Sequence, residues 1–144
     1  MLVQQILGSK SQQGVFTVKP TMTVMEAAKI QAEKRIGTVM VSSDGEHPDG
    51  ILSERDIVRH LAKSGPSVLD LPVSELMTSD LVTCAKGDRT DEVMQKMTDG
   101  RFRHMPVLED GKLIGVISLG DAVKAQLSHV AMEKEALEGM IMGQ

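Results

Sequence analysis

The segment GILSERDIVRH, from Gly50 to His60, and the segment GVISLGDAVKA, from Gly115 to Ala125, share one pattern of turn, acidic and apolar residues. They align without a gap at an offset of 65 residues. The identical pairs are Gly50/Gly115, Ser53/Ser118, Asp56/Asp121 and Val58/Val123. Identity at turn positions as well as apolar positions indicates that the chain contains an internal duplication.

The duplication continues upstream of these segments at an offset of 66 residues, so the first copy carries one extra loop residue. The identical pairs there are Thr17/Thr83, Glu26/Glu92, Arg35/Arg101, Val41/Val107, Asp44/Asp110 and Gly45/Gly111. The two copies together cover most of the chain. We therefore expect two tandem units that pack against each other with pseudo-two-fold symmetry.

Each copy is predicted to fold in the order β-α-β-β-α, which places the chain in the α+β class. The first copy has a short strand near Val15, a helix over residues 23–34, a strand from Thr38, and a strand that ends at Ser53. The second copy has the equivalent elements near Leu81, over residues 90–100, from His104, and up to Ser118. A helix begins after each of these serines, and Asp-Gly turns predict a hairpin in each copy.

The stretch SGPSVLDLP, from Ser64 to Pro72, holds one glycine and two prolines and is predicted to be the linker. The predicted units are residues 1–65, with an N-terminal helix, and residues 66–144, with an extended C-terminal helix. Each repeat of roughly 50 residues would be marginally stable alone, which is why the two are expected to pack together.

Composition excludes several classes of protein. The chain has 144 residues, 41% hydrophobic and 25% charged, as expected of a globular protein with one domain or two small ones. It has two Phe, no Tyr and no Trp, which excludes a site that stacks bases on several aromatic rings. The net charge of −4 argues against binding to DNA.

The single cysteine, Cys84, can form neither an internal disulfide nor a cysteine-rich zinc site. A reducing cytoplasm is therefore the expected location. The first residues, MLVQQILGSK, lack the basic flank and apolar core of a signal peptide. No apolar run approaches the roughly 20 residues of a membrane span, so no membrane association is expected.

The repeated Ser-x-x-Asp turns have two interpretations. A serine followed three residues later by an acidic residue is a variant of the capping box that begins a helix. A strand-to-helix turn also directs backbone N–H groups and the positive end of a helix outward, which suits an anion. The neighbouring carboxylate can accept both hydroxyls of a ribose. The two interpretations are compatible.

The second copy adds the stretch RFRHMPV, in which Arg101, Arg103 and His104 come before Pro106. Proline has no N–H group to donate to a neighbouring strand, so we expect Pro106 to interrupt the strand. Backbone groups would then be free to form hydrogen bonds with the edge of a planar ring. The nearby cations suit a phosphate group. The alternative is that these cations form a solvated basic rim.

No group of residues predicts catalysis or metal binding. The four histidines, at positions 47, 60, 104 and 129, do not have the spacing of metal ligands. Neither a phosphate-binding loop nor a nucleophile with a neighbouring base is present. We expect no catalytic residue, no metal site and no enzyme activity.

The β-α-β-β-α repeat, the strand HMPV, the acidic-Gly hairpin and the segments GILSERD and GVISLGD resemble a tandem pair of CBS domains, the module named after cystathionine β-synthase. The likeness covers about residues 10–130 and is closest to short stand-alone bacterial proteins. The first copy departs from it at Met40, where the second has Pro106. The resemblance implies a disc-like Bateman module whose two clefts bind AMP, ADP, ATP, NAD(H) or S-adenosylmethionine.

The resemblance also implies roles for individual residues. In the second cleft Asp121 would hold the ribose hydroxyls, beside Ser118 and Thr83. Arg103 and His104 would approach the phosphate, and the backbone of Met105 and Pro106 would face adenine. The first-cleft residues are the equivalents Thr17, Gly37, Thr38, Ser53 and Asp56, with Arg55 as a phosphate candidate. Gly37 and Thr38 replace Arg103 and His104, so the first cleft is expected to bind phosphate less firmly.

The expected function is a non-enzymatic regulatory module that senses an adenine nucleotide in the clefts between its paired units. Since the sequence carries neither a catalytic nor a transport domain, it is expected to act in trans on an unidentified partner protein. One alternative is an oligomerisation or interaction module with vestigial clefts. A second alternative is an RNA-binding module that uses the residues RFRH.

The last predicted helix, from Leu119 to about Gly139, suggests a homodimer. Its apolar residues form one stripe, interrupted by Lys134 and composed of Val123, Leu127, Val130, Leu137 and Ile141. A unit of roughly 50 residues cannot cover this stripe along its whole length. The N-terminal residues Leu2, Val3, Ile6 and Leu7 form a second stripe that can pack on it. The alternative is that the last helix folds back on its own unit.

Overall fold

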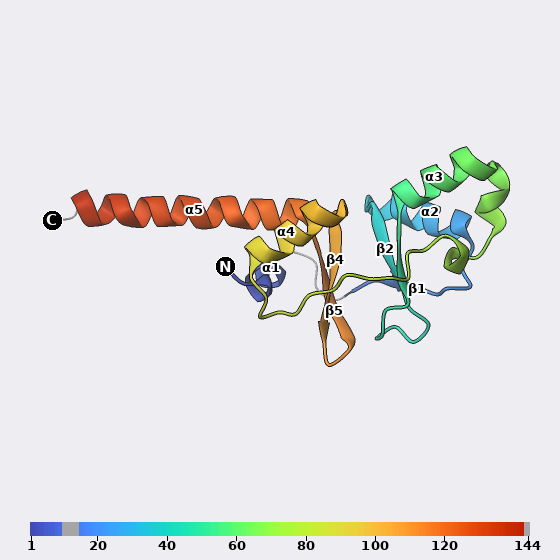
Figure 1. Ribbon diagram of the computed structural model, residues 1–144, viewed down its shortest axis with the longest axis horizontal. Coiled ribbons are helices and arrows are strands. Elements are labelled where there is room, and N and C mark those ends of the chain that lie inside the picture. Colours follow the sequence, from blue (N-terminus) through green and yellow to red (C-terminus); the bar gives the residue numbers. More distant parts are fainter. Residues whose placement is uncertain (10–14, 143–144) are drawn as a thin grey trace. The chain divides into compact units, whose positions relative to one another are not determined.

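The computed structural model describes residues 1–9 and 15–142, and its elements are labelled in Figure 1. Residue contacts divide the chain into two compact units. The first-repeat unit consists of Gly14–Val82 and Leu108–Ile114. The second-repeat unit consists of Met1–Gln13, Thr83–Val107 and Gly115–Gln144. Each unit contains helices and strands, which confirms the expected α+β class.

The sheet of the first-repeat unit has three strands in the order β1 (Thr17–Val18), β2 (Thr38–Val41) and β3 (Gly50–Ser53). β1 is parallel to β2, with Thr17 opposite Met40. β2 is antiparallel to β3, with Thr38 opposite Ser53. The first residues of β1 and β2 and the last residue of β3 therefore lie at the same end of the sheet.

Two helices complete this unit and contact each other, α2 (Val24–Lys34) and α3 (Glu54–Ser64). Both begin where the sequence predicts, because Thr23 and Ser53 cap them by accepting backbone N–H groups. Full burial of an aliphatic side chain contributes about 1.5–3 kcal/mol. The buried core of the unit consists of Val18, Val24, Ala27, Val39, Val41, Leu52, Ile57, Val73 and Leu76.

The stretch expected to be a linker packs into the first-repeat unit. It forms two short 3-10 helices, η1 (Pro66–Asp70) and η2 (Val73–Glu75), whose Val68 and Val73 are buried. Further along, Thr78 and Ile51 exchange two backbone hydrogen bonds, of 2.8 and 2.9 Å. This arrangement differs from the expected division between residues 65 and 66. The reason is that Val68 and Val73, which follow Pro66 and Pro72, complete the core of the first-repeat unit.

The hairpin of β4 (His104–Glu109) and β5 (Lys112–Ser118) is shared between the units. Residues 104–107 and 115–118 lie in the second-repeat unit, and the turn region Leu108–Ile114 lies in the first-repeat unit. Asp110 and Gly111 join the strands with φ of 53° and 78°, and positive φ at both residues is what a type I′ turn requires. The predicted Asp-Gly hairpin is thus confirmed. The strand expected near Leu81 is reduced to one parallel bridge between Cys84 and Val107, at the position of the Val18–Val41 pair in the first repeat.

Three helices belong to the second-repeat unit, α1 (Val3–Ser9), α4 (Thr90–Gly100) and α5 (Leu119–Met142), and α5 contacts both of the others. The buried hydrophobic residues of the unit are Val3, Ile6, Cys84, Val93, Met97, Met105, Val107, Ile117 and Ala122. In residues 1–9 and 15–142, no helix has the length and apolar character needed to cross a lipid bilayer.

The N-terminal helix packs with the second repeat and not with the first. Its Val3 N–H donates to the Asp88 carbonyl at 2.9 Å, and Leu2 forms a bridge with Arg89, the residue that precedes α4. In the first-repeat unit Pro72 forms the same kind of bridge with Thr23, the residue that precedes α2. α1 therefore occupies, in the second-repeat unit, the place that η2 occupies in the first.

Candidate functional site

The two Ser-x-x-Asp turns form the same reciprocal pair of hydrogen bonds. The Ser53 hydroxyl accepts from the Asp56 N–H at 3.2 Å, and Oδ2 of Asp56 accepts from the Ser53 N–H at 2.9 Å. Ser118 and Asp121 repeat this arrangement, with both distances 3.0 Å. Both turns are therefore capping boxes, as one interpretation of the sequence predicts, and the box engages Oδ2 of each aspartate.

The aspartate of the first repeat has an additional protein partner. Oδ1 of Asp56 accepts a hydrogen bond from Nη2 of Arg59 at 2.7 Å, and the carboxylate is nearly buried. The second repeat has Lys124 at the position of Arg59. A ligand hydroxyl at Asp56 would therefore compete with the guanidinium group of Arg59, whereas the equivalent position of the second repeat carries the ammonium group of Lys124.

Each unit brings its predicted residues to one end of its sheet. In the first repeat Thr17 and Thr38 begin two strands, Ser53 ends the third, and α3 starts there. In the second repeat His104 begins β4, Ser118 ends β5 and α5 starts there. Thr83 directly precedes the bridge at Cys84. These two sheet ends are called here the first-repeat site and the second-repeat site.

A backbone hydrogen bond ties the helix start of each site to the neighbouring strand. The Glu54 N–H donates to the Gly37 carbonyl at 2.8 Å, and the Leu119 N–H donates to the Arg103 carbonyl at 2.8 Å. These two carbonyls are therefore used by the fold. The remaining first-turn N–H groups and the positive end of the helix dipole favour an anionic group at each site.

Pro106 does not interrupt its strand, so that expectation is wrong. β4 continues from His104 to Glu109 through the proline, and the Pro106 carbonyl accepts from the Cys84 N–H at 3.0 Å. Because β4 is an outer strand with a single bridge on the side away from β5, the missing N–H breaks no regular ladder. Met105 and Pro106 are both buried.

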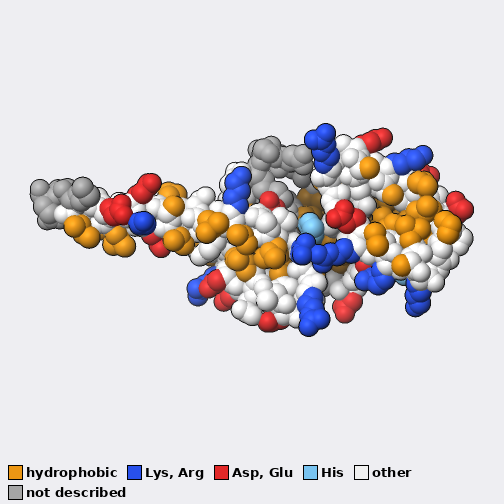
Figure 2. All heavy atoms as spheres, turned by 90° about the horizontal axis from the view of Figure 1, so that it is seen from above, with side chains coloured by type: hydrophobic (Ala, Val, Ile, Leu, Met, Phe, Trp, Pro, Cys, Tyr) orange, Lys and Arg blue, Asp and Glu red, His pale blue; other side chains and the backbone are white. Residues whose placement is uncertain are grey.

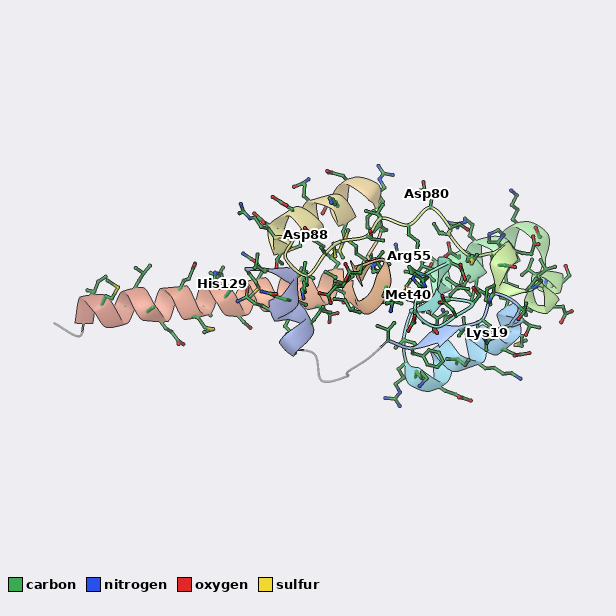
Figure 3. The ribbon with its side chains drawn as sticks, turned by 90° about the horizontal axis from the view of Figure 1, so that it is seen from below. Lys19, Met40, Arg55, Asp80, Asp88 and His129 are labelled. Atoms are coloured by element: carbon green, nitrogen blue, oxygen red, sulfur yellow. The ribbon has the colours of Figure 1, made fainter. Side chains whose placement is uncertain are left out.

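The charged groups at the two sites differ. Arg55 and Arg103 are both exposed, and neither forms an ion pair with another residue in the described ranges; Arg55 is labelled in Figure 3. At the first-repeat site the Glu54 carboxylate lies 3.3 Å from the point that a Cβ on Gly37 would occupy. The second-repeat site has Arg103 and Leu119 at these positions, so it carries a cation where the first carries a carboxylate.

Glu54 and Arg59 are the site residues that the sequence interpretation missed. Arg59 could have been found from its i,i+3 spacing to Asp56, which places the two side chains on one face of a helix. Glu54 could not, because its contact with Gly37 depends on how α3 meets β2. In residues 1–9 and 15–142, no three His, Cys, Asp or Glu side chains are grouped to hold a metal ion.

Known proteins with the same architecture can now be compared. A solved CBS-domain protein from Agrobacterium tumefaciens is 40% identical, with a TM-score of 0.83 over 88% of this chain and 99% of that one. A CBS domain protein from Pyrobaculum aerophilum complexed with AMP is 27% identical, with a TM-score of 0.72 over 84% of this chain and 89% of that one.

A third structure is the CBS domain pair of protein MJ0100 in complex with 5′-methylthioadenosine and S-adenosyl-L-methionine. It is 25% identical, with a TM-score of 0.77 over 90% of this chain and 98% of that one. Among curated relatives, a mitochondrial CBS domain-containing protein of Arabidopsis thaliana is 34% identical over 84% of this chain, which spans 61% of that protein.

The family model described as "CBS domain" matches twice, at residues 9–63 and 73–128. The two matches correspond to the two sequence repeats and leave out the whole segment expected to be a linker, residues 64–72. Together they cover well over half of the chain, and the solved structures agree with them. The chain therefore belongs to the CBS-domain family and contains a tandem pair of these domains.

Proposed function

We propose that this protein is a regulatory module that binds an adenosine ligand and performs no catalysis of its own. The observation that supports the proposal best is the duplicated arrangement of Ser, Asp and a helix N-terminus at one sheet end of each unit. CBS-domain structures similar to this chain hold AMP, or 5′-methylthioadenosine and S-adenosylmethionine. Binding would control a partner protein or a neighbouring domain.

At the second-repeat site we assign Asp121 to the ribose hydroxyls, with Ser118 and Thr83 beside the sugar. Arg103 and His104 are assigned to the phosphate, and the Met105–Pro106 backbone to the adenine edge. The first-repeat site uses the equivalent residues Thr17, Gly37, Thr38, Ser53 and Asp56. It also has Arg55, whose counterpart in the second repeat is Gly120, as a phosphate candidate. A carboxylate can accept two hydroxyl groups at once, which suits it to a ribose diol.

We assign different ligands to the two sites, because the second-repeat site carries Arg103 where the first-repeat site carries Glu54. Arg103 beside the start of α5 favours a ligand with a phosphate, such as AMP, ADP, ATP or NAD(H). Glu54 beside Gly37 would repel a phosphate at the first-repeat site. That site fits a neutral or cationic adenosine ligand better, with S-adenosylmethionine as the candidate.

The proposal is tested by calorimetric titration with AMP, adenosine and S-adenosylmethionine. Asp121→Ala removes two hydrogen bonds to a charged group, each worth about 1.5–3 kcal/mol, so AMP affinity should fall at least about tenfold. Asp56→Ala is the matched control, because it removes the same capping bond from α3 and should leave AMP binding at the second-repeat site unchanged. Unchanged affinity of Asp121→Ala for all three ligands would contradict the assignment.

Arg103→Ala separates the phosphate contact from the rest of the site. Since the exposed guanidinium would touch only the phosphate, the variant should lose AMP affinity and keep its adenosine affinity. An equal loss for both ligands would show that Arg103 is structural.

We propose further that the protein is a homodimer and that it works in the cytoplasm. The dimer is supported by the exposed apolar side chains of α5, and the compartment by the single thiol of Cys84, which is buried and free. The same apolar side chains favour the second candidate function, an association module. In that case none of the adenosine ligands would raise the melting temperature.

A further inference from the structure

Within residues 1–9 and 15–142, no element covers the C-terminal half of α5. Every residue from Val130 to Ile141 is exposed. His129, labelled in Figure 3, marks the start of this stretch. Figure 2 shows hydrophobic side chains along the projecting part of the helix. A single helix exposed on all sides is only marginally stable in water, so this half of α5 requires a partner.

The apolar side chains of α5 follow a heptad pattern. Val123, Val130 and Leu137 are seven residues apart and occupy position d. Leu127 and Ile141 occupy position a, together with Lys134, so the spacing alternates between four and three residues without a break. Their exposed fractions are 38% for Val123, 66% for Leu127, 51% for Val130, 61% for Leu137 and 73% for Ile141. This is the seam of a two-stranded coiled coil.

We propose that α5 pairs with α5 of a second copy in antiparallel orientation, with the two-fold axis near Met132. This rests on the homodimer proposed above and adds its interface and orientation. In the antiparallel register that uses the whole seam, Val123 packs against Ile141 of the second copy, and Leu127 against Leu137. Val130 packs beside the aliphatic stem of Lys134, whose ammonium group reaches solvent.

Charge decides between the two orientations. A parallel pair would place Lys134 against Lys134 in the seam, and Glu133 at position g would face Glu138 at position e of the second copy. The antiparallel pair separates the lysines and brings Lys124 beside Glu138 of the second copy, twice by symmetry. Glu133 lies at position g near the axis and faces Glu133 of the second copy, which is one repulsive pair against the two attractive pairs of Lys124 with Glu138. The Glu133 carboxylate also lies 3.1 Å from Nε2 of His129 on the same helix.

The interface is tested by sedimentation equilibrium of the full chain with and without Leu137→Asp. The seam substitution should raise the dissociation constant at least about a hundredfold, because it buries a charge without a partner. Met132→Asp is the matched control. Met132 is 69% exposed and apolar but lies at position f, away from the seam, so its dimer should be unchanged. A monomeric wild type at tens of micromolar would overturn both the dimer and the pairing; a dimer insensitive to Leu137→Asp would overturn only the pairing.

The orientation is tested by charge exchange. Glu138→Lys should weaken an antiparallel dimer roughly tenfold, because two attractive pairs become repulsive, and adding Lys124→Glu should restore it. In a parallel dimer Glu138→Lys would instead face Glu133 and tighten the association. Tighter association of the single variant would therefore overturn the antiparallel orientation.

Spin labels give an independent measure of the same orientation. Met132→Cys and Gly139→Cys both place a label at position f, outside the seam. In the antiparallel dimer the two labels at 132 lie level, whereas those at 139 are offset by about 21 Å along the axis, at 1.5 Å per residue. The distance between labels should therefore be clearly longer at 139 than at 132. Equal distances at the two positions would show a parallel pair.

Discussion

Replacing either of two equivalent glycines with alanine should destabilise the protein by different amounts. Gly50 and Gly115 occupy the same position in β3 and β5. A Cβ on Gly50 would lie 2.5 Å from Sδ of Met77 and 2.9 Å from the Thr78 carbonyl oxygen, whereas a Cβ on Gly115 would meet only the Leu7 side chain, at 2.5 Å from Cδ2. Ordinary contacts at a Cβ are 3.4–4 Å. Both substitutions create an overlap, but the groups that must move differ.

The Thr78 carbonyl cannot retreat cheaply, because it accepts the Ile51 N–H at 2.9 Å while the Thr78 N–H donates to Ile51. Gly50→Ala should therefore cost about 2–3 kcal/mol, the upper range for overpacking, with a weakened hydrogen bond included. The Leu7 side chain can change rotamer, so Gly115→Ala should cost about 0.5–1.5 kcal/mol. For a chain of this size each kcal/mol lowers the melting temperature by about 2–4 °C.

Thermal unfolding followed by far-ultraviolet circular dichroism measures both losses, since the chain has neither Trp nor Tyr to report by fluorescence. Leu7→Ala should abolish the cost of Gly115→Ala, and the double-mutant cycle should give a coupling of about 1 kcal/mol. Gly8→Ala is the control, because open space surrounds that position in α1 and alanine favours a helix. A cost of Gly115→Ala that persists without the Leu7 side chain would refute the placement of α1 on β5.

Two further predictions concern single side chains. Burial raises the pKa of the Cys84 thiol from 9.0 to about 11. At pH 8 the native protein should therefore react with a thiol reagent far more slowly than the denatured protein. Immediate labelling of the native protein would contradict the burial of Cys84. Because this pKa is raised in the folded state, the corresponding stability should be lost as the pH rises from 9 towards 11. Arg101 ends α4 in the left-handed region at φ 57°, so Arg101→Gly should stabilise the fold by about 1 kcal/mol in a thermal melt, and a lower melting temperature would contradict this prediction.

Local signals in the sequence predicted the helix starts and the second hairpin turn correctly. The capping residues Thr23, Ser53 and Ser118 act on backbone groups within three residues, so the helix starts could be located without knowledge of the fold. The Asp110–Gly111 turn is equally local. The internal repeat then brought the Ser and Asp of each copy into equivalent positions, and both sheet ends hold them as predicted.

Contacts between distant residues could not be predicted in the same way. Val3 and Asp88 are neighbours only because α1 packs in the second-repeat unit, although Val3 and Ile6 have the same apolar spacing as Val73 and Leu76. The composition of residues 64–72 suggested a linker, but Val68 becomes buried. Whether Pro106 interrupts its strand depends on which edge of β4 lacks the N–H group. The contact between Glu54 and Gly37 depends on the angle at which α3 meets β2.

The place of α1 has a consequence for the order in which the chain folds during synthesis. The strands and helices of the first repeat have all been synthesised once residue 82 has emerged, and only Leu108–Ile114 of its unit are still to come. The residues with which α1 forms a unit, 83–107 and 115–144, are synthesised later. Until those residues exist, the surface on which Val3 and Ile6 pack in the complete fold is missing. The place of η2 in the first repeat is the structural equivalent of that surface. During synthesis α1 can therefore compete with Val73 and Leu76 for this place in the first repeat. Loop length does not favour η2, because Leu2 is 21 residues from Thr23 whereas Pro72 is 49 residues from it. The correct occupant is therefore selected by its contacts, which are the hydrogen bond from the Val73 N–H to the Met22 carbonyl at 2.7 Å and the burial of Val73 and Leu76.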